Sequence, residues 1–167
     1  MSTNGYMHRS GSYSTSWKGC ARRQWCNGGF RQSVPESLRN VFKKCIVLTA
    51  ESYNSSTVQQ TQDYFFLPAA AEVWKGHRTY GNGSSAGTGT AYSNIYEFNQ
   101  LTRFEWYEIE RNLYKAQGHG GTYVSTWSER SPWYNDIRYN CFVMGTEPGS
   151  SFGFADSVRG ISPVGCL

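Results

Sequence analysis

The sequence predicts a single loop-rich domain of mixed helices and strands with a core built from aromatic rings. The chain has 167 residues, a length that suits one domain. Only 38% of the residues are hydrophobic and 17% are charged, yet 16% are aromatic. Disordered chains are poor in aromatic residues and rich in charge, so this composition argues against disorder. The eighteen glycines indicate turns and long loops between the elements.

The first predicted element is a helix near residues 34–45. Ser33 and Glu36 have the spacing of a capping box, and Pro35 suits the first turn of a helix. Apolar residues then recur at helical spacing and predict one apolar face. These residues are Leu38, Val41, Phe42 and Cys45.

Two strands and a short helix are predicted next. The β-branched run 45–49 predicts a buried strand, and the polar stretch 51–63 that follows is typical of a loop. The apolar run 64–67 predicts a second strand, which Pro68 ends. Residues 69–74 favour a helix with that proline at its entrance.

The second half predicts one more helix and then mainly strands. Residues 75–93 are rich in Gly, Ser, Thr and Asn and form the longest predicted loop. Broken helical spacing predicts a helix over 97–117, and the polar stretch 128–136 separates two of the later strands. The predicted strands are 123–127, 139–144, a short run at 152–154, and a closing strand over 158–166.

Charge and hydropathy limit the classes of partner. The net charge of +4 is mild, and the basic residues are scattered, so we expect no nucleic-acid partner. No apolar run reaches the length of a membrane span, so we expect no membrane insertion. Residues 1–16 form a polar arm without the apolar segment of a signal peptide, followed by a domain over 17–167. We therefore expect a soluble protein, exported, if at all, within a larger particle or by lysis.

The five cysteines do not define a metal site or a disulfide framework. An odd number argues against a domain held by disulfides alone, and no CxxC spacing suggests zinc. Cys20 and Cys26 are the one local pair, and a bridge between them stays open. Otherwise we expect the thiols to be small buried apolar groups.

Four segments carry a resemblance to a known family through their order and spacing. They are Trp17…Arg23-Gln24-Trp25-Cys26-Asn27, Phe66-Leu67-Pro68 with Glu72-Val73, Thr126 to Pro132 with Arg130-Ser131-Pro132, and the closing Val158 to Leu167. Together they resemble a bacterial and phage family of unknown function with a C-type-lectin-like fold. The sequence departs from the family pattern at two places. It has an extra polar step at Ser128-Glu129, and it has a polar arm where the family has a first strand.

The resemblance implies an α+β domain of the C-type-lectin-like kind, with two helices flanking a small twisted antiparallel sheet and long loops. It favours a non-enzymatic phage virion component, such as a capsid decoration, tail-fibre or receptor-binding module. Such a protein would bind other virion proteins or a host surface ligand and form a homo-oligomer. The alternatives are a bacterial surface adhesin or glycan-binding module and, least favoured, a thiol-dependent oxidase that uses Cys141 and Cys166.

The candidate site residues fall into a structural pair and a binding cluster. Glu72 and Arg130 can form a bidentate ion pair that ties the helix after Pro68 to the β half. Large rings mixed with hydrogen-bonding side chains predict a ligand-binding surface. That surface is Trp133, Tyr134, Asn135, Asp136, Arg138 and Tyr139. The three histidines lie apart in loops and oxygen ligands are few, so we expect no metal and no cofactor.

Overall fold

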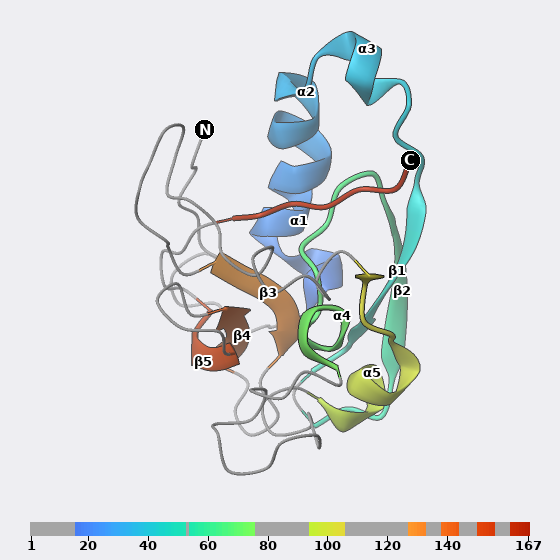
Figure 1. Ribbon diagram of the computed structural model, residues 1–167. Helices are drawn as coiled ribbons and strands as arrows, with labels where there is room; N and C mark the ends of the chain where they lie inside the picture. The colour runs from blue at the N-terminus through green and yellow to red at the C-terminus, as the bar shows by residue number, and fades with distance from the viewer. Residues whose placement is uncertain are drawn as a thin grey trace.

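The computed structural model describes residues 16–52, 54–75, 94–105, 127–132, 138–143, 150–155 and 161–167. Within them, short helices accompany two antiparallel sheets, one of two strands and one of three (Figure 1). The mixed α+β class is therefore as predicted. The predicted loop 75–93 lies almost wholly outside the described residues.

The N-terminal part is helical and begins earlier than predicted. A short turn, η1 (Trp17–Gly19), precedes a continuous helical stretch. This stretch consists of α1 (Ala21–Trp25), a π-helical turn η2 (Cys26–Phe30) and α2 (Arg31–Ser33).

The helix predicted over 34–45 is wrong in extent, because the chain forms only the single turn α3 (Glu36–Arg39). Val34 is extended, as expected of a residue that precedes proline, and this separates α2 from α3. Ser33 Oγ donates to the Phe30 carbonyl instead of capping the next helix. The predicted apolar face is largely open, since Leu38 is 54% exposed.

The first sheet pairs β1 (Cys45–Ala50) with β2 (Val58–Asp63) in antiparallel register, from Cys45 opposite Asp63 to Ala50 opposite Val58. Strand β1 is as predicted, whereas β2 corrects the loop expected over 51–63. In β2 the inward positions are the buried Thr61 and Asp63. Val58 is the one apolar residue of this strand and its buried positions are polar, so hydropathy alone does not reveal it.

The segment after β2 contains α4 (Ala70–Trp74), a helix as predicted, whose residues are all buried. The strand predicted over 64–67 is reduced to one bridge, between Phe66 and Val164. The described part of the closing strand, 161–167, adds only a second bridge, between Lys43 and Cys166. Regular pairing therefore does not hold this C-terminal segment.

The next helix, α5 (Ile95–Gln100), starts two residues before the helix predicted over 97–117 and is much shorter within the described residues. The Asn94 side chain accepts hydrogen bonds from Tyr96 N and Glu97 N and so caps the helix start. Residues 101–105 are not α-helical, and the rest of the predicted span lies outside the described residues.

The second sheet has the order β3-β4-β5 and is antiparallel throughout. Its strands are β3 (Trp127–Pro132), β4 (Tyr139–Val143) and β5 (Ser150–Phe154). Residues 128–132, predicted as part of a connection, therefore form a strand, and all six residues of β3 are buried. The β-branched residues that mark most strands are absent from β3, so its sequence did not predict it.

Rings fill the core, as the composition predicted. Trp17 belongs to one buried cluster with Phe65, and Trp74 and Trp127 belong to a second cluster with the alanines of α4. All three indoles are no more than 1% exposed.

Candidate functional site

Arg130 of β3 and Glu72 of α4 form the bidentate ion pair that their sequence context predicts. Arg130 Nη1 donates to Glu72 Oε2 at 2.5 Å, and Nη2 donates to Oε1 at 2.7 Å. The Arg130 side chain is fully buried and that of Glu72 is 7% exposed. Glu72 Oε2 also accepts from Ala69 N at the start of α4. The pair therefore connects the helix start directly to the second sheet.

The same guanidinium reaches two further segments. Arg130 Nε donates to Thr49 Oγ1 at 3.0 Å, and Nη1 donates to the Leu67 carbonyl at 2.7 Å. Burial alone would lower the pKa of Arg130, but the charge of Glu72 and its hydrogen bonds, together with nearby carboxylates, raise that pKa above its usual value. The side chain is therefore a permanently charged tie between the two sheets.

Glu97 of α5 is a second buried carboxylate in this region and is 0% exposed. It accepts hydrogen bonds from Ala50 N at 2.7 Å and from the Ser131 hydroxyl. Ser131 Oγ in turn accepts from Ala70 N at 2.9 Å. Burial is the main cause that raises the pKa of Glu97, although the positive charge of Arg130 opposes it.

Glu129, the extra polar step noted in the sequence, is also fully buried. Its Oε1 accepts a hydrogen bond from the Trp74 indole Nε1 at 2.7 Å. The two residues come from β3 and α4, so this bond is a second tie between the elements that Arg130 and Glu72 join. This role cannot be read from the sequence, because an isolated Glu in a polar run gives no sign of burial.

Asp63, at the end of β2, organises a second buried polar cluster. Its carboxylate accepts from four side chains of the described chain, and its own side chain is fully buried. The donors are Trp17 Nε1 at 2.9 Å, Arg23 Nε at 2.7 Å, Asn27 Nδ2 at 3.0 Å and Thr61 Oγ1 at 2.7 Å. Trp17, Arg23 and Asn27 belong to the first of the four segments that carry the family resemblance. The spacing of these three residues therefore places their side chains around one carboxylate.

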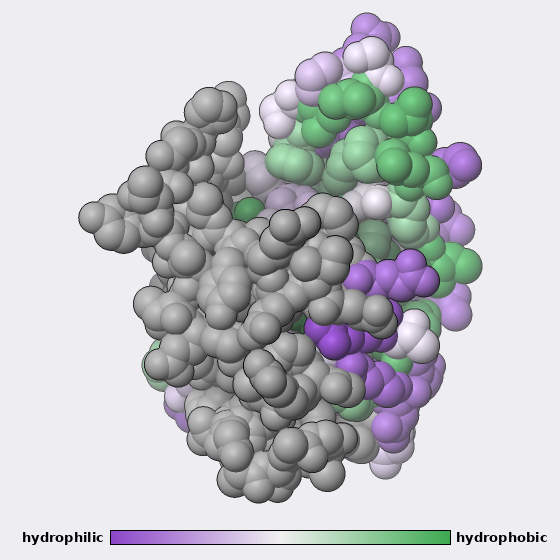
Figure 2. Space-filling view, in the orientation of Figure 1, coloured by the Kyte–Doolittle hydropathy of each residue, from purple (hydrophilic) through white to green (hydrophobic). Residues whose placement is uncertain are grey.

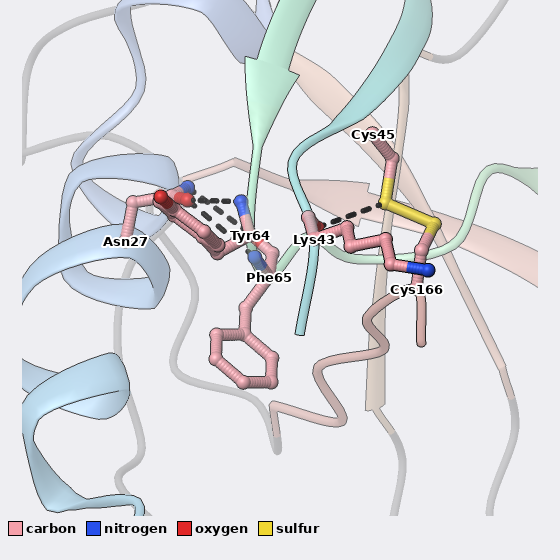
Figure 3. The surroundings of a disulfide bond; sticks show 6 residues. All are labelled: Asn27, Lys43, Cys45, Tyr64, Phe65 and Cys166. Atoms are coloured by element: carbon pink, nitrogen blue, oxygen red, sulfur yellow. Dashed lines mark hydrogen bonds between the residues drawn. A yellow bond between two sulfur atoms is a disulfide. The ribbon is translucent and has the colours of Figure 1, made fainter. Parts of the chain in front are cut away.

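Asn27 extends this cluster to the chain that follows β2. Its Oδ1 accepts from Tyr64 N at 2.7 Å and from Phe65 N at 3.4 Å, while Nδ2 donates to the Phe65 carbonyl at 3.0 Å (Figure 3). The Asn27 side chain therefore satisfies backbone groups of Tyr64 and Phe65, which are not part of a regular strand.

A disulfide joins Cys45 at the start of β1 to Cys166 near the C-terminus, 121 residues later (Figure 3). The expectation of buried thiols is therefore wrong for Cys45 and Cys166. The bridge between Cys20 and Cys26 that the sequence left open does not form, because both are buried thiols. Connectivity of this kind cannot be read from spacing, because the partners meet only through the fold.

The three remaining thiols are poor nucleophiles. Burial raises the pKa of Cys20 to about 11 and also raises the pKa values of Cys26 and Cys141 well above their usual range. Since the thiolate is the reactive form, these cysteines are unreactive near neutral pH. The pair on which the oxidase alternative rested, Cys141 and Cys166, is not joined in this structure, because Cys166 is bonded to Cys45.

A surface cleft of about 270 Å³ lies beside the Asp63 cluster. It is lined by Arg23, Gln24, Asn27, Lys44, Gln62, Asp63 and Tyr64. The Arg31 guanidinium carbon lies 4.0 Å from the centre of the Tyr64 ring, and Lys44 Nζ lies 5.5 Å from it. The cleft is therefore polar and has basic groups around an aromatic ring.

The predicted binding cluster is described only in part. Trp133, Tyr134, Asn135 and Asp136 lie outside the described residues. Arg138 is exposed and lies over the Tyr139 ring at 5.5 Å, and Tyr139 stacks on Phe154 at 4.5 Å. The histidines likewise lie outside the described residues.

The described ranges hold neither a cluster of metal ligands nor a helix of membrane-spanning character. No group of three or more His, Cys, Asp or Glu residues there can hold a metal ion. No helix in that part of the chain is long and apolar enough to cross a membrane.

Comparisons with known proteins identify a family and nothing closer. No curated protein matches the chain, and no solved structure matches it. One family model matches residues 1–167, the whole chain. The chain therefore belongs to the family described as a domain of unknown function, DUF6273.

Proposed function

We propose that the chain is a non-enzymatic binding module of a phage virion, with a C-type-lectin-like fold. In this role it contacts other virion proteins or a ligand on the host surface, as a capsid decoration, tail-fibre or receptor-binding module. One observation carries the proposal. The buried charged groups of Arg130, Glu72 and Asp63 are engaged in hydrogen bonds within the domain itself.

Buried charges held in this way favour a rigid scaffold over a reaction site. A general acid or base must reach a substrate proton, and a nucleophile must present its reactive form. Glu97 is fully buried and accepts a hydrogen bond from Ala50 N, and the Cys141 thiol is buried with a raised pKa. A rigid scaffold that carries its recognition residues on loops and surface clefts is a common arrangement in binding domains.

The disulfide supports a place outside the reducing cytoplasm. Disulfides persist on virion and cell surfaces and in secreted proteins, and they are rare in the cytosol. Cys45–Cys166 fixes the C-terminal segment to β1, and two isolated bridges are otherwise the backbone pairing of residues 161–167. The bond therefore has a structural purpose that only an oxidising location sustains.

The exposed apolar side chains support a protein partner. Figure 2 shows hydrophobic residues gathered at the end of the molecule that carries α3 and the C-terminus. Leu38 is 54% exposed, Val41 51% and Leu167 75%. Contiguous apolar surface on a soluble domain usually marks an interaction site. A neighbouring virion subunit, including a further copy of this chain, fits such a surface.

Electron microscopy and mass spectrometry of purified particles test the proposal. We expect the chain in particles banded on a density gradient, at a copy number that matches a symmetric position. Its recovery only from the cytosol, with no copies in particles or at the cell surface, would contradict the proposal.

A bacterial surface adhesin or glycan-binding module is the second candidate, because the disulfide fits that location equally well. Surface labelling of intact cells separates the two. The adhesin is favoured if the chain is labelled on cells that release no particles, and the virion component if labelling requires particle production.

A further inference from the structure

We propose that the cleft beside Asp63 binds an acidic sugar through Lys44 and Arg23. The inference rests on the proposed binding function and names a site and a ligand class for it. The cleft, of about 270 Å³, is large enough for a monosaccharide and too small for a folded partner. Its walls come from α1, η2, and the adjoining ends of β1 and β2, so rigid elements hold it.

The charge balance of the cleft favours an anion. Asp63 is its one acidic lining residue, and four side-chain donors already satisfy that carboxylate. Arg23 is held by Asp63 and by the Lys18 carbonyl, at 3.0 Å, but its side chain remains 26% exposed. The Lys44 ammonium has no ion-pair partner among the described residues and lies 5.5 Å from the Tyr64 ring centre. The Arg31 guanidinium adds a further positive charge against the same ring.

The remaining lining groups favour a sugar over a simple inorganic anion. Gln24 and Gln62 each carry an amide that both donates and accepts, which matches the paired roles of a hydroxyl group. Both are exposed, so they can move to the ligand without losing an internal bond. A carboxylate beside several hydroxyls, as in a uronic acid, uses the cations and the amides together.

The experiment is isothermal titration calorimetry of the full chain with glucuronate, galacturonate, a glucuronate-terminated oligosaccharide, and glucose as the neutral control. We expect saturable binding of at least one acidic ligand and none of glucose. Comparison of the free sugar acids with the oligosaccharide shows whether the site takes a free metabolite or the end of a glycan.

Three variants place the binding in the cleft. Lys44→Gln and the nearly isosteric Gln62→Glu should each lower the affinity for the acidic ligand by about tenfold or more. The first substitution removes a charge-assisted contact, and the second places a negative charge beside the ligand's own. Lys43→Gln is the matched control, since it makes the same charge change one residue away and does not line the cleft. Circular dichroism should show that all three variants remain folded.

Two results would overturn the inference. One is the absence of saturable binding to every acidic ligand, and the other is equal weakening by Lys43→Gln and Lys44→Gln. Neither result contradicts the proposed function, which particle composition tests separately. Conversely, a cleft that binds glucuronate in a cytosolic protein would uphold this inference and contradict the virion role.

Discussion

Arg130 donates two hydrogen bonds to the backbone carbonyl of Leu48, from Nε at 3.2 Å and from Nη2 at 2.9 Å. Two residues along β1, the backbone N–H of Ala50 donates to the Glu97 carboxylate. These side chains supply partners for buried backbone groups of β1 where a wider sheet would supply a third strand. The two small sheets are thus joined by buried charged groups and not by continuous strand pairing.

Replacement of Arg130 by Met should be strongly destabilising. The change keeps an apolar stem but leaves the Glu72 carboxylate and the Leu48 and Leu67 carbonyls without their donor. Breaking a buried pair on one side costs about 3–5 kcal/mol. Urea denaturation followed by tryptophan fluorescence measures the free energy of unfolding.

The double variant with Glu72→Gln provides the control for this experiment. It removes the uncompensated charge, so it should recover part of the lost free energy relative to Arg130→Met alone. If the free energy of unfolding of Arg130→Met lay within about 1 kcal/mol of the wild-type value, the ion pair would not hold the two sheets together.

Glu97 should make stability depend on pH in mildly acidic solution. Its folded-state pKa is raised, chiefly by burial, so the folded protein holds the proton more tightly than the unfolded chain. This contribution to stability is complete below the ordinary Glu pKa of about 4.3 and is lost as the pH rises through the folded-state pKa. As the pH rises from about 4.3 through the folded-state pKa, the free energy of unfolding of the wild type should decrease relative to that of Glu97→Gln. Parallel curves for the two proteins would contradict the assignment.

Gly165 should not tolerate even a methyl group. A Cβ at this position would lie 2.8 Å from the Tyr64 carbonyl and 2.9 Å from Phe42 Cδ1. Gly165→Ala should therefore lower stability by about 1–3 kcal/mol. Gly19→Ala is the control, because nothing lies within 4 Å of its Cβ position. Equal thermal midpoints for the two variants would show that the C-terminal segment does not pack against Phe42.

The free thiols should resist modification in the native protein. Cys20, Cys26 and Cys141 are buried and their pKa values are raised, so iodoacetamide at pH 8 should leave them unmodified over hours. All three should react once urea unfolds the chain, as intact-mass spectrometry can count. Rapid labelling of any of them without urea would place that thiol at the surface.

Some apolar patterns predicted the element that forms, but those over 34–45 and 64–67 did not, and strands whose buried residues are polar were not predicted. The run at β1 and the alanine-rich α4 were evident, as was the meeting of Glu72 and Arg130. Strand β2 was missed because its inward residues are Thr61 and Asp63. Only the fold reveals that these side chains face donors from distant segments.

The candidate site residues also divide into those that the sequence indicates and those that only the fold reveals. The spacing of Trp17, Arg23 and Asn27 was noticed, but their shared partner Asp63 lay in a presumed loop. Cys166 was grouped with the buried thiols, although it pairs with Cys45, because no local signal distinguishes a long-range bridge. Single residues that act through contacts 36 or more positions away leave no periodic pattern in the sequence.

Cysteine mapping of the protein recovered from its native particle or cell surface tests the account most directly. Non-reducing peptide mass spectrometry should find one cross-linked pair, Cys45 with Cys166, and three unmodified thiols at Cys20, Cys26 and Cys141. Five reduced cysteines would contradict the oxidising location, and a bridge between Cys141 and Cys166 would contradict the architecture.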